Sequence, residues 1–288
     1  MGSSPAGVIQ VEAPCRIVFE TDDALSGQVN AATIRQAGGG RPPVNREEAN
    51  PATGPVSVVG AMPGDALRVR IRRIKIAGEG FHTVSRNRFP DTLDGDLVWF
   101  RKLEKGKIPL PGGLAARPAP MIGVIGVAPK GDPVFTQNPG DHGGNMDCSL
   151  VRSGSVVYLP VFVPGGLLAI GDVHGTMGDG EVIGNGFEIA AEVEVELSVE
   201  RSLGISRPVV ETRTTWATLA SDESLEGAAW KATEDMVTFM VKRTDFTAKE
   251  AFLLMGARGN VRVAQIVNPL KTAWFEMAKD YLPRAVST

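Results

Sequence analysis

Two segments of the chain alternate strictly between apolar and charged residues. From Phe187 to Val199 every odd-numbered position is apolar, and in Ala66–Ile76 three apolar residues alternate with three arginines. The glutamates of the first segment are Glu188, Glu192, Glu194, Glu196 and Glu200. A period of two places successive side chains on opposite faces of a β-strand. We therefore predict two strands, each with one buried and one solvated face, and we assign the glutamate row to solvent without a catalytic role.

The last third of the chain changes from a strand pattern to a helical one. Apolar residues between Leu225 and Met240 recur at a spacing close to 3.6, and Thr247 with Glu250 forms a capping-box pattern ahead of a second helix. Strands precede helices without βαβ alternation, which favours an α+β fold. We expect one β-rich domain over residues 1–288, with a multi-stranded sandwich- or barrel-like core over 10–200, a helical part over 220–258 and a closing strand over 260–268.

Composition and charge exclude several functional classes. The 288 residues carry a formal net charge of −3, so the chain lacks the basic surface that nucleic acids require. No apolar run reaches the roughly 18 residues of a membrane span, and the start of the chain, Met1–Cys15, has none of the features of a secretory signal. Cys15 and Cys148 lack the spacing of a metal knuckle, so we expect free thiols and a cytoplasmic location. The dispersed 34 glycines and 20 prolines predict tight turns between short strands.

The segment GDVHGTMGDGE, residues 171–181, concentrates the candidate chemistry. Crowded carboxylates repel one another unless a positive partner joins them. If the run ending at His174 is extended, Asp172 and His174 project from the same face. A carboxylate beside an imidazole suits a divalent ion, with zinc as the first expectation and calcium or another divalent ion as alternatives. An activated water there would attack a carbonyl, and Glu181 or Asp179 could take its proton.

A second glycine-rich loop, residues 138–147, offers the same kinds of side chain. It contains His142 between Asp141 and Asp147. The chain has three histidines, and two of them lie in such loops, so we expect the loops to converge. The simpler alternative, in which these acids bind backbone N–H groups in turns, stays open at this point. The third histidine, His82, is expected on a surface loop.

These two loops also carry a family resemblance. NPGDHGGNMD at residues 138–147, followed by GDVHGTMGDGE, resembles the acetamidase/formamidase family, and residues 50–71 and 261–272 are similar to its early and late segments. The resemblance implies hydrolysis of short amides such as formamide or acetamide by a β-rich, self-associating cytoplasmic enzyme. It also implies a divalent metal near Asp172 and His174. The residues that match as functional candidates are Asn145, Asp147, Asp172, His174, Asp179 and Glu181.

The leading hypothesis is a metal-dependent amidohydrolase acting on a small amide. The expected metal ligands are Asp147, Asp172, His174 and His142, and the expected catalytic residues are Glu181, Asp179 and Asn145. Glu181 is expected to pass a proton from water to the leaving ammonia, and a homodimer is the first expectation for the assembly. Two alternatives remain. A non-catalytic metal- or ligand-binding β-rich protein would have a closed coordination shell, and a metal-free thiol amidase would use Cys148 as its nucleophile.

Overall fold

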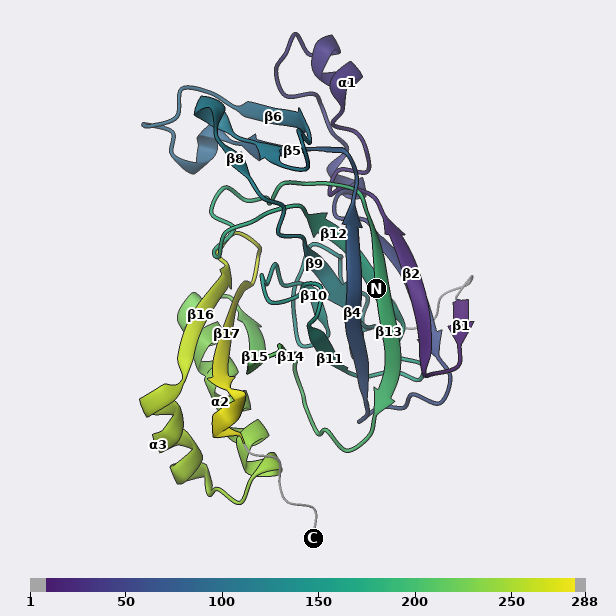
Figure 1. The fold of residues 1–288 in the computed structure, drawn as a ribbon, viewed down its shortest axis with the longest axis vertical. Helices are drawn as coiled ribbons and strands as arrows, with labels where there is room; N and C mark the ends of the chain where they lie inside the picture. The colour runs from purple at the N-terminus through teal and green to yellow at the C-terminus, as the bar shows by residue number, and fades with distance from the viewer. Residues whose placement is uncertain (1–8, 283–288) are drawn as a thin grey trace.

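The structure, a computed structural model, describes residues 9–282, and most strands within them belong to two large sheets (Figure 1). The smaller sheet has the strand order β1-β3-β12-β9-β10. Its strands are β1 (Ile9–Val11), β3 (Ala52–Val58), β9 (Met121–Gly126), β10 (Gly143–Asn145) and β12 (Leu168–His174). β1 and β3 are parallel, whereas the other neighbours are antiparallel.

The larger sheet has the order β16-β17-β15-β14-β11-β4-β13-β2, with antiparallel neighbours throughout. Its strands are β2 (Cys15–Thr21), β4 (Ala66–Ile76), β11 (Val156–Pro160), β13 (Ala191–Glu200), β14 (Val209–Glu211), β15 (Thr215–Asp222), β16 (Asn260–Gln265) and β17 (Lys271–Ala278). β4 and β13 are the two strands that alternation predicts, and both are confirmed. The pairing of β4 with β13 skips Arg72, which moves the next buried position of β4 from the odd-numbered series to Ile74.

The main core lies between the two sheets. Its apolar side chains include Val69 of β4, Val195 of β13, Ile125 of β9 and Ile170 of β12, all fully buried. The side chains that alternate with these on β4 and β13 face outward and, apart from Ser198, are charged. The observed β-rich α+β architecture therefore confirms the predicted fold class.

A second core joins the larger sheet to two C-terminal helices. The helices are α2 (Leu225–Arg243) and α3 (Ala248–Arg258). Trp216 of β15 and Phe275 of β17 pack with Met236 of α2, whereas Leu219 of β15 belongs to the main core. β15 is thus covered on both faces, which explains why it lacks a polar stripe. The predicted capping box at Thr247 and Glu250 begins α3.

Smaller elements at one end of the molecule were not predicted. Figure 1 places the hairpin β5–β6 and the helix α1 at the same end. These elements are α1 (Ala31–Gln36), β5 (Glu79–Val84), β6 (Leu97–Lys102), β7 (Ile108–Pro109) and β8 (Ala115–Ala116). Of these elements, β5 matters for the candidate site, because its residues Phe81 and Thr83 line the cavity there.

At the C-terminal end, β15 continues to Asp222, so the helical part begins later than residue 220. Where the sequence predicts a closing strand, β16 ends at Gln265, and β17 follows as a further strand.

Among residues 9–282, no helix combines the length and apolar character needed to cross a membrane. Residues 1–8, on which the expectation about a secretory signal partly rests, and residues 283–288 lie outside the described residues.

Candidate metal centre

Asp172 and His174 lie at the end of β12, side by side as their spacing predicts. β12 is buried over its whole length because it lies between β3 and β9 inside the sheet. Nε2 of His174 is 3.6 Å from Oδ1 of Asp172. The end of this strand therefore places two ionisable side chains next to each other in the protein interior, where both are shielded from water.

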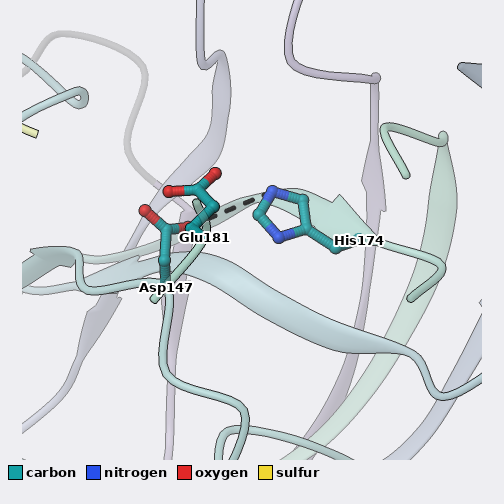
Figure 2. Close-up of side chains that lie close together, drawn as sticks. All are labelled: Asp147, His174 and Glu181. Carbon is teal, nitrogen blue, oxygen red and sulfur yellow. Dashed lines mark ion pairs between the residues drawn. The ribbon is translucent and has the colours of Figure 1, made fainter. Parts of the chain in front are cut away.

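Three further carboxylates reach the same imidazole from other parts of the chain. Asp147 follows β10, and its Oδ1 is 4.0 Å from Nε2 of His174; Glu188 precedes β13, and its Oε1 is 3.3 Å from the same nitrogen. Glu181 lies in the turn after β12 and faces Asp147, as Figure 2 shows. His174 and all four carboxylate residues are buried, with at most 6% of any of them exposed. We call these five residues the acid–His cluster.

The acid–His cluster contains two overlapping sets of possible metal ligands. Asp147, His174 and Glu181 form one set, and Asp172, His174 and Glu188 form the other. In each set the potential ligand atoms lie within 4.8 Å of one another. The first glycine-rich loop and the second therefore do converge, and they do so through Asp147.

The assignment of Glu188 to solvent was wrong. Its backbone bridges to Phe81 of β5 and to His174 of β12, so it lies between two strands before the exposed row on β13 begins. The residue is 2% exposed. The alternating pattern gave no signal of this difference, because Glu188 has the same parity as the exposed glutamates that follow it.

Three asparagine side chains hold the carboxylates in place. Asn50 donates from Nδ2 to Oδ2 of Asp172 at 2.8 Å, and Asn268 donates from Nδ2 to Oδ2 of Asp147 at 2.8 Å. With its amide nitrogen towards the carboxylates, Asn145 donates to Oδ1 of Asp147 at 3.1 Å and to Oδ2 of Asp172 at 3.0 Å. Sequence reasoning found Asn145 only by resemblance and missed Asn50 and Asn268.

Unusual backbone conformations are concentrated at this site. Asn50, Asp147, Asp172 and Glu181 have φ angles of 51°, 45°, 54° and 47°, and they are four of the eight non-glycine residues with positive φ in the described part of the chain. Such conformations cost about 1–3 kcal/mol each and persist where the surroundings enforce them. The three carboxylates are thus held in orientations that a relaxed loop would abandon.

Two glycines allow the side chains of the cluster to approach the backbone. A Cβ atom on Gly123 would lie 2.5 Å from Oδ1 of Asp147 and 2.7 Å from Oδ2 of Asp172. A Cβ atom on Gly186 would lie 2.3 Å from Cγ of His174. A side chain at either position would displace the acid–His cluster.

Burial controls the protonation of the cluster. Burial, followed by the charge of Asp172, raises the pKa of Asp147 to about 6. Burial and the charge of Asp147 raise the pKa of Glu181 to about 10. Burial raises the pKa of Glu188 to about 8, although the charge of His174 opposes the shift. Burial alone would lower the pKa of His174, but the charges of Glu188 and Asp172 outweigh it and raise this pKa well above its ordinary value.

The cluster has the donors and the charge that a divalent ion needs. Several buried polar atoms have no hydrogen-bond partner among the described residues: Oδ1 of Asp172, both ring nitrogens of His174, Oε2 of Glu181 and Oε2 of Glu188. Unpartnered buried polar atoms are costly. One cation in contact with the carboxylate oxygens and with one of the two ring nitrogens would partner most of these atoms and offset the negative charge, so the residues present fit a metal.

Other residues with predicted roles lie outside the acid–His cluster. Asp179 is exposed and accepts a hydrogen bond from Ser149 at 2.6 Å. His142 is buried and belongs to neither ligand set found in residues 9–282; burial lowers its pKa to about 4.

Burial raises the pKa of the Cys148 thiol to about 12, which disfavours a nucleophilic thiolate. His82 is half-buried in β5 beside the ring of Phe187, so its assignment to a surface loop was wrong.

The acid–His cluster opens onto a cavity of about 350 Å³. Asp172, Glu181 and Glu188 line its floor together with Asn145 and Asn268. A larger groove of about 840 Å³ lies elsewhere, and no residue of the cluster lines it. The smaller cavity is therefore the place where a ligand could meet the candidate metal ligands.

The chain belongs to the acetamidase/formamidase family. A sequence model of the Acetamidase/Formamidase family matches residues 127–274, which include all five residues of the acid–His cluster. The resemblance noted from the sequence is thereby confirmed.

Solved structures extend the similarity to nearly the whole chain. The crystal structure of an acetamidase from Bacillus halodurans is 37% identical, with a TM-score of 0.90, and the match covers 98% of this chain and 94% of that one. The structure of a recombinant predicted acetamidase/formamidase from Thermoanaerobacter tengcongensis is also 37% identical, with a TM-score of 0.92 and coverage of 98% and 92%. A curated formamidase of Methylophilus methylotrophus is 39% identical over 79 residues, which are 26% of this chain and 19% of that protein. The chain thus matches about a fifth of the length of this curated relative.

Proposed function

We propose that the protein is a metal-dependent hydrolase that converts small amides to a carboxylic acid and ammonia. The observation that carries the proposal is the acid–His cluster, in which four buried carboxylates surround one buried imidazole at the floor of a cavity. Membership of the acetamidase/formamidase family supports this reaction, because the named relatives are acetamidases and formamidases.

His174, Asp172 and Glu188 are the proposed metal ligands. The two carboxylate oxygens nearest to Nε2 of His174 belong to these acids, at 3.6 Å and 3.3 Å. An imidazole among the donors favours zinc or a similar transition ion over calcium, which takes oxygen ligands. A bound divalent ion supplies Lewis-acid polarisation of the amide carbonyl and lowers the pKa of water.

Glu181 is the proposed proton carrier. The cavity reaches this carboxyl group, and its raised pKa keeps a proton on it at neutral pH. An amide nitrogen leaves readily only as ammonia, so it needs a proton as the C–N bond breaks. A carboxyl group that holds a proton beside the cavity can deliver it and can recover one from the attacking water.

Asn145, Asn50 and Asn268 act as positioning residues in this proposal. Their amide groups donate to Asp147 and Asp172, and these hydrogen bonds fix which carboxylate oxygens remain free to face the cavity. Partners that orient metal ligands in this way commonly contribute about 10–100-fold in metal affinity or activity.

The rival hypotheses fit the structure less well. A purely structural ion would have a closed shell of protein ligands, whereas the cavity reaches Asp172, Glu181 and Glu188. A thiol amidase would need an accessible thiolate, whereas Cys148 is fully buried and its raised pKa keeps the thiol protonated.

The protein is further proposed to act as a homodimer in the cytoplasm. Exposed apolar residues on the helical layer, among them Trp230, Phe252 and Leu253, support self-association. Neither cysteine forms a disulfide within residues 9–282, as expected in a reducing compartment. Light scattering after size-exclusion chromatography would give the mass in solution, and a monomer would contradict the dimer.

The test of the reaction combines metal content with ammonia release from formamide and acetamide. The wild-type protein should bind about one ion per chain and release ammonia. Glu181→Gln should retain the ion and lose turnover, because its amide cannot exchange the proton. If Glu181→Gln also lost the ion, the ligand set would instead be Asp147, His174 and Glu181. Full turnover by metal-free protein would contradict the proposal as a whole.

A further inference from the structure

The cavity above the acid–His cluster is larger than a two-carbon amide requires. Its volume of about 350 Å³ equals that of roughly twelve water molecules at about 30 Å³ each. Beyond the acidic floor, its lining includes three arginines, Arg41, Arg46 and Arg88. Neither the space nor the arginines have a use in the hydrolysis of a small neutral amide.

Arg88 lies directly against the turn that carries Glu181. A Cβ atom on Gly184 would be 2.8 Å from Nη2 of Arg88, so the guanidinium group occupies the space that a side chain there would fill. Gly184 in turn donates from its backbone nitrogen to the carbonyl oxygen of Glu181 at 2.7 Å. The guanidinium group of Arg88 therefore lies beside Gly184, the residue that closes the turn of the proposed proton carrier.

Arg41 and Arg46 belong to a segment that lines the cavity and is hydrogen-bonded to two other parts of the chain. The side chain of Gln28 accepts from the backbone nitrogen of Asn45 at 2.6 Å, and Nε2 of Gln137 donates to the carbonyl oxygen of Arg46 at 3.2 Å. The same segment ends at Asn50, which binds Asp172. One continuous segment therefore supplies both Arg41 and Arg46 to the cavity lining and the asparagine that binds a proposed metal ligand.

The arginines do not neutralise the acidic floor. In residues 9–282, the ion pairs of Asp147, Asp172 and Glu188 are all with His174. Arg41 pairs with Asp96, which is outside the cavity lining, at 3.6 Å, and within the same described range neither Arg46 nor Arg88 forms an ion pair. The positive charge of Arg46 and Arg88 is therefore available to a ligand, with Arg41 adding to the local positive charge, and a planar guanidinium group matches a carboxylate in a two-point contact.

We infer that the substrate is a small amide that also carries a carboxylate, such as the monoamide of a dicarboxylic acid. The inference rests on the proposed function. The amide end lies at the acid–His cluster, and the carboxylate end lies at Arg41, Arg46 and Arg88. In the reaction, water forms the new C–O bond, the C–N bond breaks, and ammonia leaves with a proton, so that the product is a dicarboxylate.

The test compares succinamate with succinamide. The two differ at one end, where succinamate has a carboxylate and succinamide has a neutral amide of similar size. Wild-type kcat/KM should be at least about tenfold higher for succinamate, and Arg88→Gln should remove most of that preference. The matched control is Arg86→Gln, which makes the same charge change at an exposed residue that does not line the cavity. This control should keep the preference.

Two results would overturn the inference while leaving amide hydrolysis intact. One is equal or better turnover of succinamide, and the other is equal loss of preference in Arg86→Gln and Arg88→Gln. If the metal-loaded protein hydrolysed no amide, the proposed function would fail, and calorimetry with succinamate would still decide the inference. Binding that weakens at least about tenfold in Arg88→Gln but not in Arg86→Gln would support it, and absence of binding would overturn it.

Discussion

Glu188 and Glu192 are four residues apart in one alternating row, yet they lie in opposite environments. Glu192 is exposed on β13 and accepts a 2.6 Å hydrogen bond from Nζ of Lys75 on β4, and this bond lowers its pKa. Glu188 is buried against His174, and burial raises its pKa to about 8. The sequence periodicity is the same for both, so the difference comes from the strands that cover Glu188, namely β5 and β12.

This contrast separates two uses of acidic residues. On the surface of β13, cross-strand lysine and arginine side chains and water balance the glutamates, and each pair contributes little to stability. In the acid–His cluster one imidazole faces four carboxylates, which cannot all be ionised without further positive charge. An excess of buried negative charge is the mark of the functional region.

The largest effect is expected when the residue common to both ligand sets is removed. His174→Ala should abolish tight metal binding and lower kcat/KM for acetamide by more than about 10³-fold, since loss of a single transition-state contact already costs about 10²–10³-fold. Metal analysis and ammonia release on the same preparation would measure both effects. Retention of the ion with normal turnover would show that the cluster is not the active centre.

The comparison of the two glutamates can be tested directly. Glu188→Gln should weaken metal binding by at least about 10²-fold, because a ligand and a buried negative charge are lost together. Glu192→Gln makes the same chemical change on the exposed part of the row and should leave metal affinity within about twofold. Titration with a metal-responsive dye would compare the variants, and equal affinities would remove the distinction drawn here.

A pair of glycine variants tests the close packing of the carboxylates. Gly123→Ala should destabilise the protein by about 1–3 kcal/mol and reduce turnover, because its Cβ would overlap Asp147 and Asp172. Gly178→Ala is the control, since a Cβ there has no atom within 4 Å. Chemical denaturation would give both free energies of unfolding. A Gly123→Ala variant as stable and active as the control would mean that the carboxylates are less constrained than the structure shows.

A smaller effect is expected from the asparagine that binds Asp147. Asn268→Ala should lower kcat/KM by about 10–100-fold while the protein still binds one ion, because it removes a hydrogen bond that orients a carboxylate. Asn268→Asp should be worse than Asn268→Ala, because it adds a negative charge to the cluster. The reverse order would argue against excess negative charge at the site.

The mildest test is the pH dependence of stability. Native Asp147, Glu181, Glu188 and His174 have raised pKa values, so between about pH 5 and pH 10 the native metal-free protein holds protons that the unfolded chain has released. Its stability should therefore be highest below this range and fall as the pH rises through it. A bound cation offsets the carboxylate charge, so the metal-loaded protein should lose less. Parallel Tm curves for the two forms would contradict this prediction.

Local patterns were enough to predict much of the fold and part of the site. The strands β4 and β13 and the capped helix α3 follow from side-chain periodicity and hydrogen bonding over a few residues, and so does the adjacency of Asp172 and His174. Asp147 was predicted as a ligand because its loop offers the same chemistry.

The remaining site residues depend on contacts between distant parts of the chain. Asn50 is 122 residues from Asp172 and Asn268 is 121 residues from Asp147, so no local pattern links them. Glu188 was misassigned because burial by β5 is invisible in its own segment. Asp179 is an acid in the same glycine-rich segment as the site residues, so the sequence does not distinguish it from them. The turn at Gly180 and Glu181 nevertheless leaves it at the surface, where it accepts a hydrogen bond from Ser149.

The central claim is that the acid–His cluster is the metal centre of an amide hydrolase, and one titration tests it most directly. Protein freed of metal by a chelator is titrated with zinc while ammonia release from acetamide is measured, alongside Glu188→Gln. We predict no turnover without zinc, recovery that saturates at about one ion per chain, and no recovery in Glu188→Gln at the same zinc concentrations. Full turnover before any metal is added, or recovery in Glu188→Gln equal to that of the wild type, would contradict the claim.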